Sequence, residues 1–133
     1  DLPEGLVVVK PPIKYLESLS LMASADGLLV IDAPAEKSVF LPSKLVDYVG
    51  AGRPIFGLTP PGAAATLINR LGGWVADPAD LSATAEVTDA FLSSLRRSRE
   101  NAAETWGIAS IRKNYEAAHV AIEFGRILQE LLA

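Results

Sequence analysis

The sequence contains no cysteine and only one histidine, His119, among its 133 residues. The missing thiols exclude disulfides, thiolate metal sites and cysteine nucleophiles, and they are weakly consistent with a cytoplasmic location. One imidazole and scattered carboxylates make a poor ligand set, so no metal site is predicted. A Ser-His-Asp arrangement is not predicted either, because the only histidine falls in a C-terminal stretch with helical spacing.

Positive charge and long apolar runs are also scarce. Twelve Lys and Arg residues against sixteen Asp and Glu residues give a formal net charge of −4, which argues against a nucleic-acid partner. No apolar run reaches the roughly 18 residues that a transmembrane helix needs, so no membrane span is predicted. Half of the residues are nevertheless hydrophobic and 21% are charged, which is typical of a folded globular protein.

The length of the chain and its first residues define the expected organisation. A chain of 133 residues has the ordinary size of one domain. It opens on Asp1, without an initiator methionine and without a basic segment before an apolar run, so no signal peptide is predicted. We therefore expect residues 1–133 to form a single domain that belongs to a longer, cytoplasmic protein.

Short apolar runs alternate with segments of helical spacing. The runs at residues 5–10, 28–31, 54–58 and 74–76 predict buried strands. Helices are predicted between them at residues 14–25, 42–52 and 63–71, and after them at residues 80–101 and 107–132. This alternation predicts an α/β fold, a Rossmann-like parallel sheet with helices on both faces and two C-terminal helices. The ligand site of such a sheet lies beyond the carboxyl ends of its strands.

The start of the predicted helix at residues 42–52 is the strongest candidate for a binding site. Free backbone N–H groups and the helix dipole attract an anion such as a diphosphate at such a start. Lys44 adds a positive charge in the first turn, and Asp47 offers a carboxylate to ribose hydroxyls. A plain Pro-Ser helix start with a solvated Lys44–Asp47 pair explains the same residues, and local physics alone favours that interpretation.

The whole pattern is more specific than its parts. The sequence LPSKLVDYVGAGRP at residues 41–54 resembles the C-terminal domain of family-four retaining glycosyltransferases of the GT-B fold. Many members carry LPSK, an acidic residue followed by tyrosine, and G-[KR]-P in this place. Residues 16–31, LESLSLMASADGLLVI, and residues 72–78, GGWVADP, resemble neighbouring elements of the family, so the resemblance covers nearly all of the chain.

The resemblance implies a function and a set of contacts. The parent enzyme would transfer a hexosyl group, with retention of configuration, from a nucleotide diphosphate-sugar to an acceptor held by a further N-terminal domain. It would need no cofactor, and the fragment alone would be inactive. No catalytic residue is assigned. The residues implied in donor binding are Lys10, Pro12 and Ile13 near the base, and Pro42, Ser43, Lys44, Leu45 and Asp47 near the diphosphate and ribose.

One departure from the family and two rival functions stay open at this point. The family often has two glutamates with seven residues between them: Asp47 stands at the second position, and Val39 stands at the first. Glu36 in the same loop is the candidate to replace the missing first glutamate. A nucleotide-sugar epimerase on the same architecture, or a non-catalytic Rossmann-like module for protein contacts, are the alternative functions. Peripheral contact of the parent enzyme with the inner face of a membrane is compatible with the resemblance.

Overall fold

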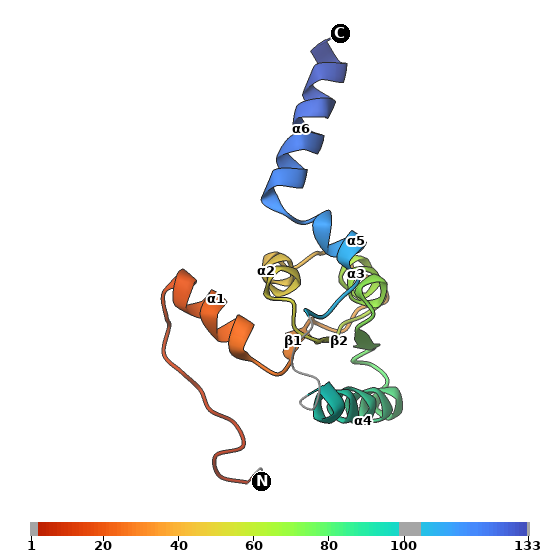
Figure 1. Ribbon diagram of the computed structural model, residues 1–133. Helices are drawn as coiled ribbons and strands as arrows, with labels where there is room; N and C mark the ends of the chain where they lie inside the picture. The colour runs from red at the N-terminus through yellow and green to blue at the C-terminus, as the bar shows by residue number, and fades with distance from the viewer. Residues whose placement is uncertain (1–2, 99–104, 133) are drawn as a thin grey trace.

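The computed structural model describes residues 3–98 and 105–132 (Figure 1). Its centre is a parallel sheet of three strands in the order β1-β2-β3, and each strand is paired in register with its neighbour. The strands are β1 (Leu28–Ile31), β2 (Ile55–Leu58) and β3 (Trp74–Ala76). An α/β fold with a parallel sheet, consistent with a Rossmann-like architecture, is therefore confirmed.

Helices precede, connect and follow the strands. Helix α1 (Tyr15–Ser24) leads into β1, α2 (Ser43–Ala51) connects β1 to β2, and α3 (Ala63–Leu71) connects β2 to β3. Helix α4 (Leu81–Ser98) follows the sheet, and α5 (Ala109–Lys113) and α6 (Ala117–Leu132) come last. The bounds of α3 equal the predicted ones, and residues 99–101 of the predicted helix at 80–101 lie outside the described residues.

The two faces of the sheet are covered by different helices (Figure 1). On one face, Val30 and Ile55 of the sheet pack against Leu45 of α2 and Ile68 of α3. On the other face, Phe56 and Ala76 pack against Phe91 of α4. The prediction of helices on both faces is confirmed, and burial of these apolar side chains is the main force that holds the layers together.

A row of aromatic rings joins the two faces at the β3 side. The ring centroids of Trp74 and Phe91 lie 5.4 Å apart, and those of Trp74 and Trp106 lie 6.5 Å apart. The backbone N–H of Trp106 donates to the carbonyl of Gly52, which ends α2 in the left-handed conformation with a φ of 62°. Both tryptophans therefore contribute to packing. The end of α2 at Gly52 agrees with the glycine stop predicted there.

The predicted first strand is absent from the sheet. Residues 5–10 form no strand, and Val7, Val8 and Val9 are 64%, 72% and 89% exposed. A run of β-branched residues fits a pleated, half-buried surface, but a strand forms only where another strand supplies hydrogen bonds. In this structure the segment lies away from the sheet, so the sheet has three strands instead of the predicted four.

The predicted long helix at residues 107–132 is also divided. Three successive backbone N–H groups, those of Asn114, Tyr115 and Glu116, bond to the carbonyl three residues earlier, so the chain turns tightly between α5 and α6. Helix α6 then extends away from the sheet, and none of its residues is buried (Figure 1). Among the described residues, no helix is both long and apolar enough to cross a membrane.

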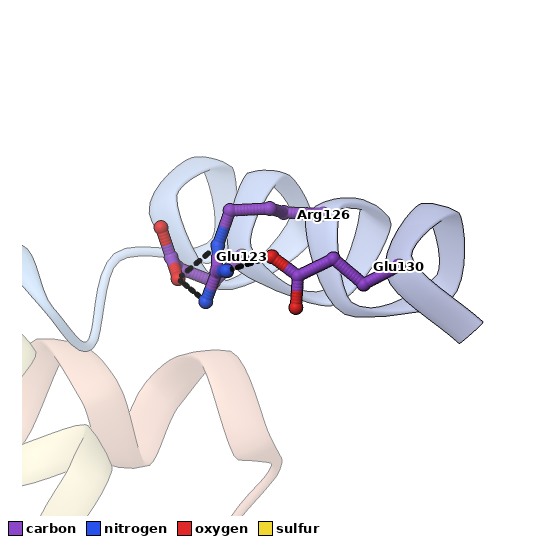
Figure 2. Close-up of polar contacts among 3 residues, drawn as sticks. All are labelled: Glu123, Arg126 and Glu130. Carbon is purple, nitrogen blue, oxygen red and sulfur yellow. Dashed lines mark hydrogen bonds and ion pairs between the residues drawn. The ribbon is translucent and has the colours of Figure 1, made fainter. Parts of the chain in front are cut away.

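One polar ladder stabilises α6 along its surface. Arg126 bonds to Glu123 one turn before it and to Glu130 one turn after it (Figure 2). All three side chains are about half exposed or more, so each pair contributes only a few tenths of a kcal/mol. The ladder supports the helix locally and does not tie it to the sheet.

Candidate anion-binding site at the carboxyl edge of the sheet

The start of α2 lies at the carboxyl edge of the sheet, meaning the side on which the parallel strands end. The helix begins at Ser43, and Pro42 holds the N-cap position with a φ of −57° and no side-chain cap. Leu45 and Val49, which are 0% and 3% exposed, anchor the helix in the core. Ser43 and Lys44 are left exposed in the first turn. The predicted helix start is thus in place, one residue later than expected.

Not every predicted contact residue offers a side chain to a ligand. Pro42 is buried, and Leu45 is fully buried in the core with its N–H bonded to the carbonyl of Pro42 at 2.9 Å. Lys44 is exposed and has no ion-pair partner within residues 3–98 and 105–132. The predicted pairing of Lys44 with Asp47 on a solvated face is therefore not formed. The free charge at this helix start belongs to Lys44.

Asp47 has a partner that the sequence did not indicate. The hydroxyl of Tyr15, at the start of α1, donates to Oδ1 of Asp47 at 2.9 Å. This bond holds the pKa of Tyr15 above its ordinary value of 10.0, and partial loss of water and the negative charge of Asp47 act in the same direction. The bond joins α1 to α2 across 32 positions of sequence and leaves Oδ2 of Asp47 without that donor.

The residues predicted to meet the base lie in an exposed, irregular segment. Lys10, Pro12 and Ile13 precede α1 and do not follow a strand, because residues 5–10 are outside the sheet. Ile13 is two residues from Tyr15, so its Cα lies within about 7 Å of the Tyr15 Cα. The Tyr15–Asp47 bond therefore brings the end of this segment to α2, while Lys10 and Pro12 are not placed at the carboxyl edge by any hydrogen bond of the described residues.

The loop after β1 is fixed to the start of α3 by Ser38. The N–H of Ser38 donates to Pro61, and its carbonyl accepts from Ala63, at 2.9 and 3.1 Å. The Ser38 hydroxyl lies 3.4 Å from Oδ2 of Asp32. Because the Ser38 carbonyl occupies the first N–H of α3, that helix start is partly closed, and the start of α2 is the more open of the two.

The sequence does not single out Ser38 as a contact residue, and the contacts that Ser38 makes explain why. Both strong bonds are made by its backbone, which any residue would supply, so the side-chain type carries little signal. The one sequence feature that points to this contact is Gly62, because the backbone of Ser38 comes too close to leave room for a side chain there. The two residues weighed for the missing carboxylate, Glu36 and Val39, are both exposed in this loop.

A hollow of about 290 Å³ lies beside α3 and the ends of β2 and β3. Its volume is close to the lower limit of ligand pockets, about 300 Å³. None of the eight residues predicted to bind the donor lines it. The lining residues are Thr59, Pro61, Gly62, Ala65, Thr66, Asn69, Val75 and Asp77.

Neither similarity to known proteins nor a cluster of metal-ligating side chains assigns a function to this site. No protein-family model, no curated protein and no solved structure matches the chain. Within residues 3–98 and 105–132, no three metal-ligating side chains come together in one group. The chemistry of the site therefore rests on the helix start, Lys44 and Asp47.

The Tyr15–Asp47 bond gives the attachment of α1 a dependence on pH. The pKa of Tyr15 is raised in the folded chain, so the bond stabilises the fold fully below the ordinary tyrosine pKa of 10.0 and is lost as the pH rises through the folded value. We expect NMR titration of the Tyr15 ring to give a higher midpoint in the wild type than in Asp47→Asn. Asp89→Asn, an exposed change on α4, should leave the midpoint unchanged; an equal shift in both variants would contradict the assignment.

Proposed function

We propose that this chain is the donor-binding domain of a GT-B glycosyltransferase. The observation that supports the proposal best is the start of α2, which is uncapped by side chains and lies at the carboxyl edge of a parallel sheet. Lys44 is exposed there without an ion-pair partner among the described residues. This combination favours a diphosphate, and the resemblance of residues 41–54 to family-four glycosyltransferases makes a nucleotide diphosphate-sugar the proposed ligand.

The proposed role of the site is electrostatic. The backbone N–H groups of the first turn and the ammonium group of Lys44 offset the charge that develops on the leaving diphosphate during glycosyl transfer. Oδ2 of Asp47 accepts a hydrogen bond from a ribose hydroxyl, since Oδ1 already accepts one from the hydroxyl of Tyr15. The acceptor would be bound by a further domain of a cytoplasmic parent enzyme, and the chain by itself would not catalyse transfer.

Replacing Lys44 with alanine should weaken binding of a nucleoside diphosphate. Loss of one charge-assisted contact corresponds to about 1.5 kcal/mol, or roughly a tenfold rise in the dissociation constant. Titration of the chain with UDP, GDP and TDP, followed by NMR, should shift the amide resonances of residues 43–47 for at least one nucleotide. Calorimetry then compares the wild type with the variant.

A matched control separates a local contact from general attraction of an anion. Lys113→Ala removes the same charge at the exposed end of α5, so it should leave the dissociation constant unchanged. Equal weakening by both variants would show that only net charge matters. Absence of any shift with all three nucleotides at millimolar concentration would remove the support for donor binding by this chain.

A further inference from the structure

We propose that Tyr15 is a positioning residue of the candidate site, and that it holds Asp47 so that the site selects a ribonucleoside diphosphate over its 2′-deoxy form. This role of Tyr15 rests on the proposed function, in which Asp47 meets the ribose of the donor. The hydroxyl of Tyr15, in the first turn of α1, donates to Oδ1 of Asp47, in the second turn of α2, at 2.9 Å. Tyr15 therefore acts on a ligand through Asp47.

The side chain of Asp47 lies on the same side of α2 as the exposed residues of the helix start. Asp47 follows Ser43 by four residues and Lys44 by three, so it is a neighbour of both on the helix surface. Side chains of a helix lean toward its N-terminus, because each Cα–Cβ bond is tilted in that direction. The carboxylate therefore lies over the first turn of α2. A nucleotide whose diphosphate is held at that turn would have its sugar hydroxyls within reach of Asp47.

The position of Tyr15 is also set by contacts at the far end of α1. There, Nε of Arg53, in the loop between α2 and β2, donates to the carbonyl of Ala23 at 2.7 Å. Met22 and Ala25 pack against the core on the same face of the sheet as α2. Helix α1 thus lies against α2 (Figure 1), whereas the ring of Tyr15 is 61% exposed. Removing the Tyr15 hydroxyl should therefore leave the helix in place.

A carboxylate held in this way favours a sugar that supplies two hydrogen-bond donors. An ionised carboxylate only accepts hydrogen bonds, and its bonds to ligand hydroxyls are charge-assisted. The bond from Tyr15 restricts the rotamers of Asp47 before a ligand arrives, which reduces the entropy lost on binding. The lone pairs that Tyr15 does not use can accept the 2′- and 3′-hydroxyls of one ribose. Because Asp47 is partly buried, a 2′-deoxyribose would leave one of these acceptor positions unpaired at a cost in affinity.

Calorimetric titration with UDP and GDP, each beside its 2′-deoxy form, tests the proposal. The wild type should bind the ribonucleotide roughly tenfold more tightly than the deoxy form, which is the effect of one charge-assisted hydrogen bond. Tyr15→Phe removes only the hydroxyl. It should weaken binding of the ribonucleotide roughly fivefold and that of the deoxy form by less, so that the preference decreases. Inorganic pyrophosphate, which has no sugar, should bind the wild type and Tyr15→Phe equally.

A second tyrosine provides the matched control. Tyr48→Phe makes the same chemical change next to Asp47 in the sequence, but the Tyr48 hydroxyl donates to the carbonyl of Leu29, at 3.3 Å. This variant should keep both the affinity and the ribose preference of the wild type. The proposal would be overturned if Tyr15→Phe bound the nucleotides as the wild type does. It would also be overturned if Tyr15→Phe bound pyrophosphate as weakly as it binds UDP or GDP, relative to the wild type, because the start of α2 would then be disturbed as a whole.

The same titrations separate the role of Tyr15 from donor binding itself. If the wild type binds UDP or GDP and loses affinity in Lys44→Ala, but binds the 2′-deoxy form equally well, donor binding stands and the role given to Tyr15 is wrong. If none of these nucleotides binds the wild type, both the proposed function and the role of Tyr15 are overturned. A ribose preference that Tyr15→Phe reduces and Tyr48→Phe retains would support both.

Discussion

Replacing Gly62 with alanine is expected to lower the free energy of unfolding by at least about 3 kcal/mol. Gly62 has a φ of 157° and a ψ of −155°, a conformation that is essentially restricted to glycine. A Cβ added there would lie 1.8 Å from the carbonyl oxygen of Ser38. The two backbones would have to separate, which breaks the bonds of Ser38 to Pro61 and Ala63. Urea denaturation measures the loss.

A second glycine provides the control for this substitution. Gly50 lies exposed in α2, and nothing lies within 4 Å of a Cβ added to it. Gly50→Ala should therefore keep the stability of the wild type or raise it by up to about 1 kcal/mol, because alanine is the better helix former. If Gly62→Ala were as stable as Gly50→Ala, the loop after β1 would not be fixed to α3 as described.

Truncating Ile68 to alanine should remove about 4 kcal/mol from the free energy of unfolding. Ile68 lies on α3 and is 0% exposed. Its side-chain branches fill the space beside Gly57 of β2 and Gly73, where an added Cβ would meet them at 2.6 Å. Neither glycine has a side chain of its own that could fill the cavity left by the truncation. A loss of this size is a large part of the roughly 5–15 kcal/mol that stabilises an ordinary domain.

Two further substitutions make the test of Ile68 quantitative. Ile68→Val removes one methyl group and should cost about 1 kcal/mol. Ile122→Ala makes the larger truncation on α6, where Ile122 is 69% exposed, and should change the free energy of unfolding by less than about 0.5 kcal/mol. Comparable losses for Ile68→Ala and Ile122→Ala would contradict the core described above.

Much of the fold could be predicted because local signals and tertiary contacts agree. The strands at residues 28–31, 55–58 and 74–76 are short apolar runs next to glycine, proline or aspartate, and α3 ends at Gly72, whose φ is 87°. Residues 5–10 have the same kind of composition but lack a partner in the structure. Composition indicates that a segment suits a sheet, whereas pairing depends on where the rest of the chain places an edge.

The candidate site also has one part that local sequence signals predict and another part that depends on contacts between distant residues. The exposed first turn of α2 with Lys44 follows from a Pro-Ser-Lys sequence at a helix start, which is a local signal. The bond from Tyr15 to Asp47 joins two helices that are 32 positions apart, and no spacing within either helix contains it. Burial of Leu45 was missed because the resemblance assigned a ligand contact to a position whose apolar side chain faces the core.

The lack of buried residues in α6 determines how the stability of this protein has to be measured. A helix of 16 residues, none of them buried, is near the length of about 12–15 residues at which isolated helices are marginal in water. It should lose helicity gradually on heating, while the sheet and its covering helices unfold together. The circular dichroism signal would be the sum of the melting of α6 and the unfolding of the sheet with its covering helices. Tryptophan fluorescence would follow the sheet alone, because Trp74 and Trp106 both pack beside it.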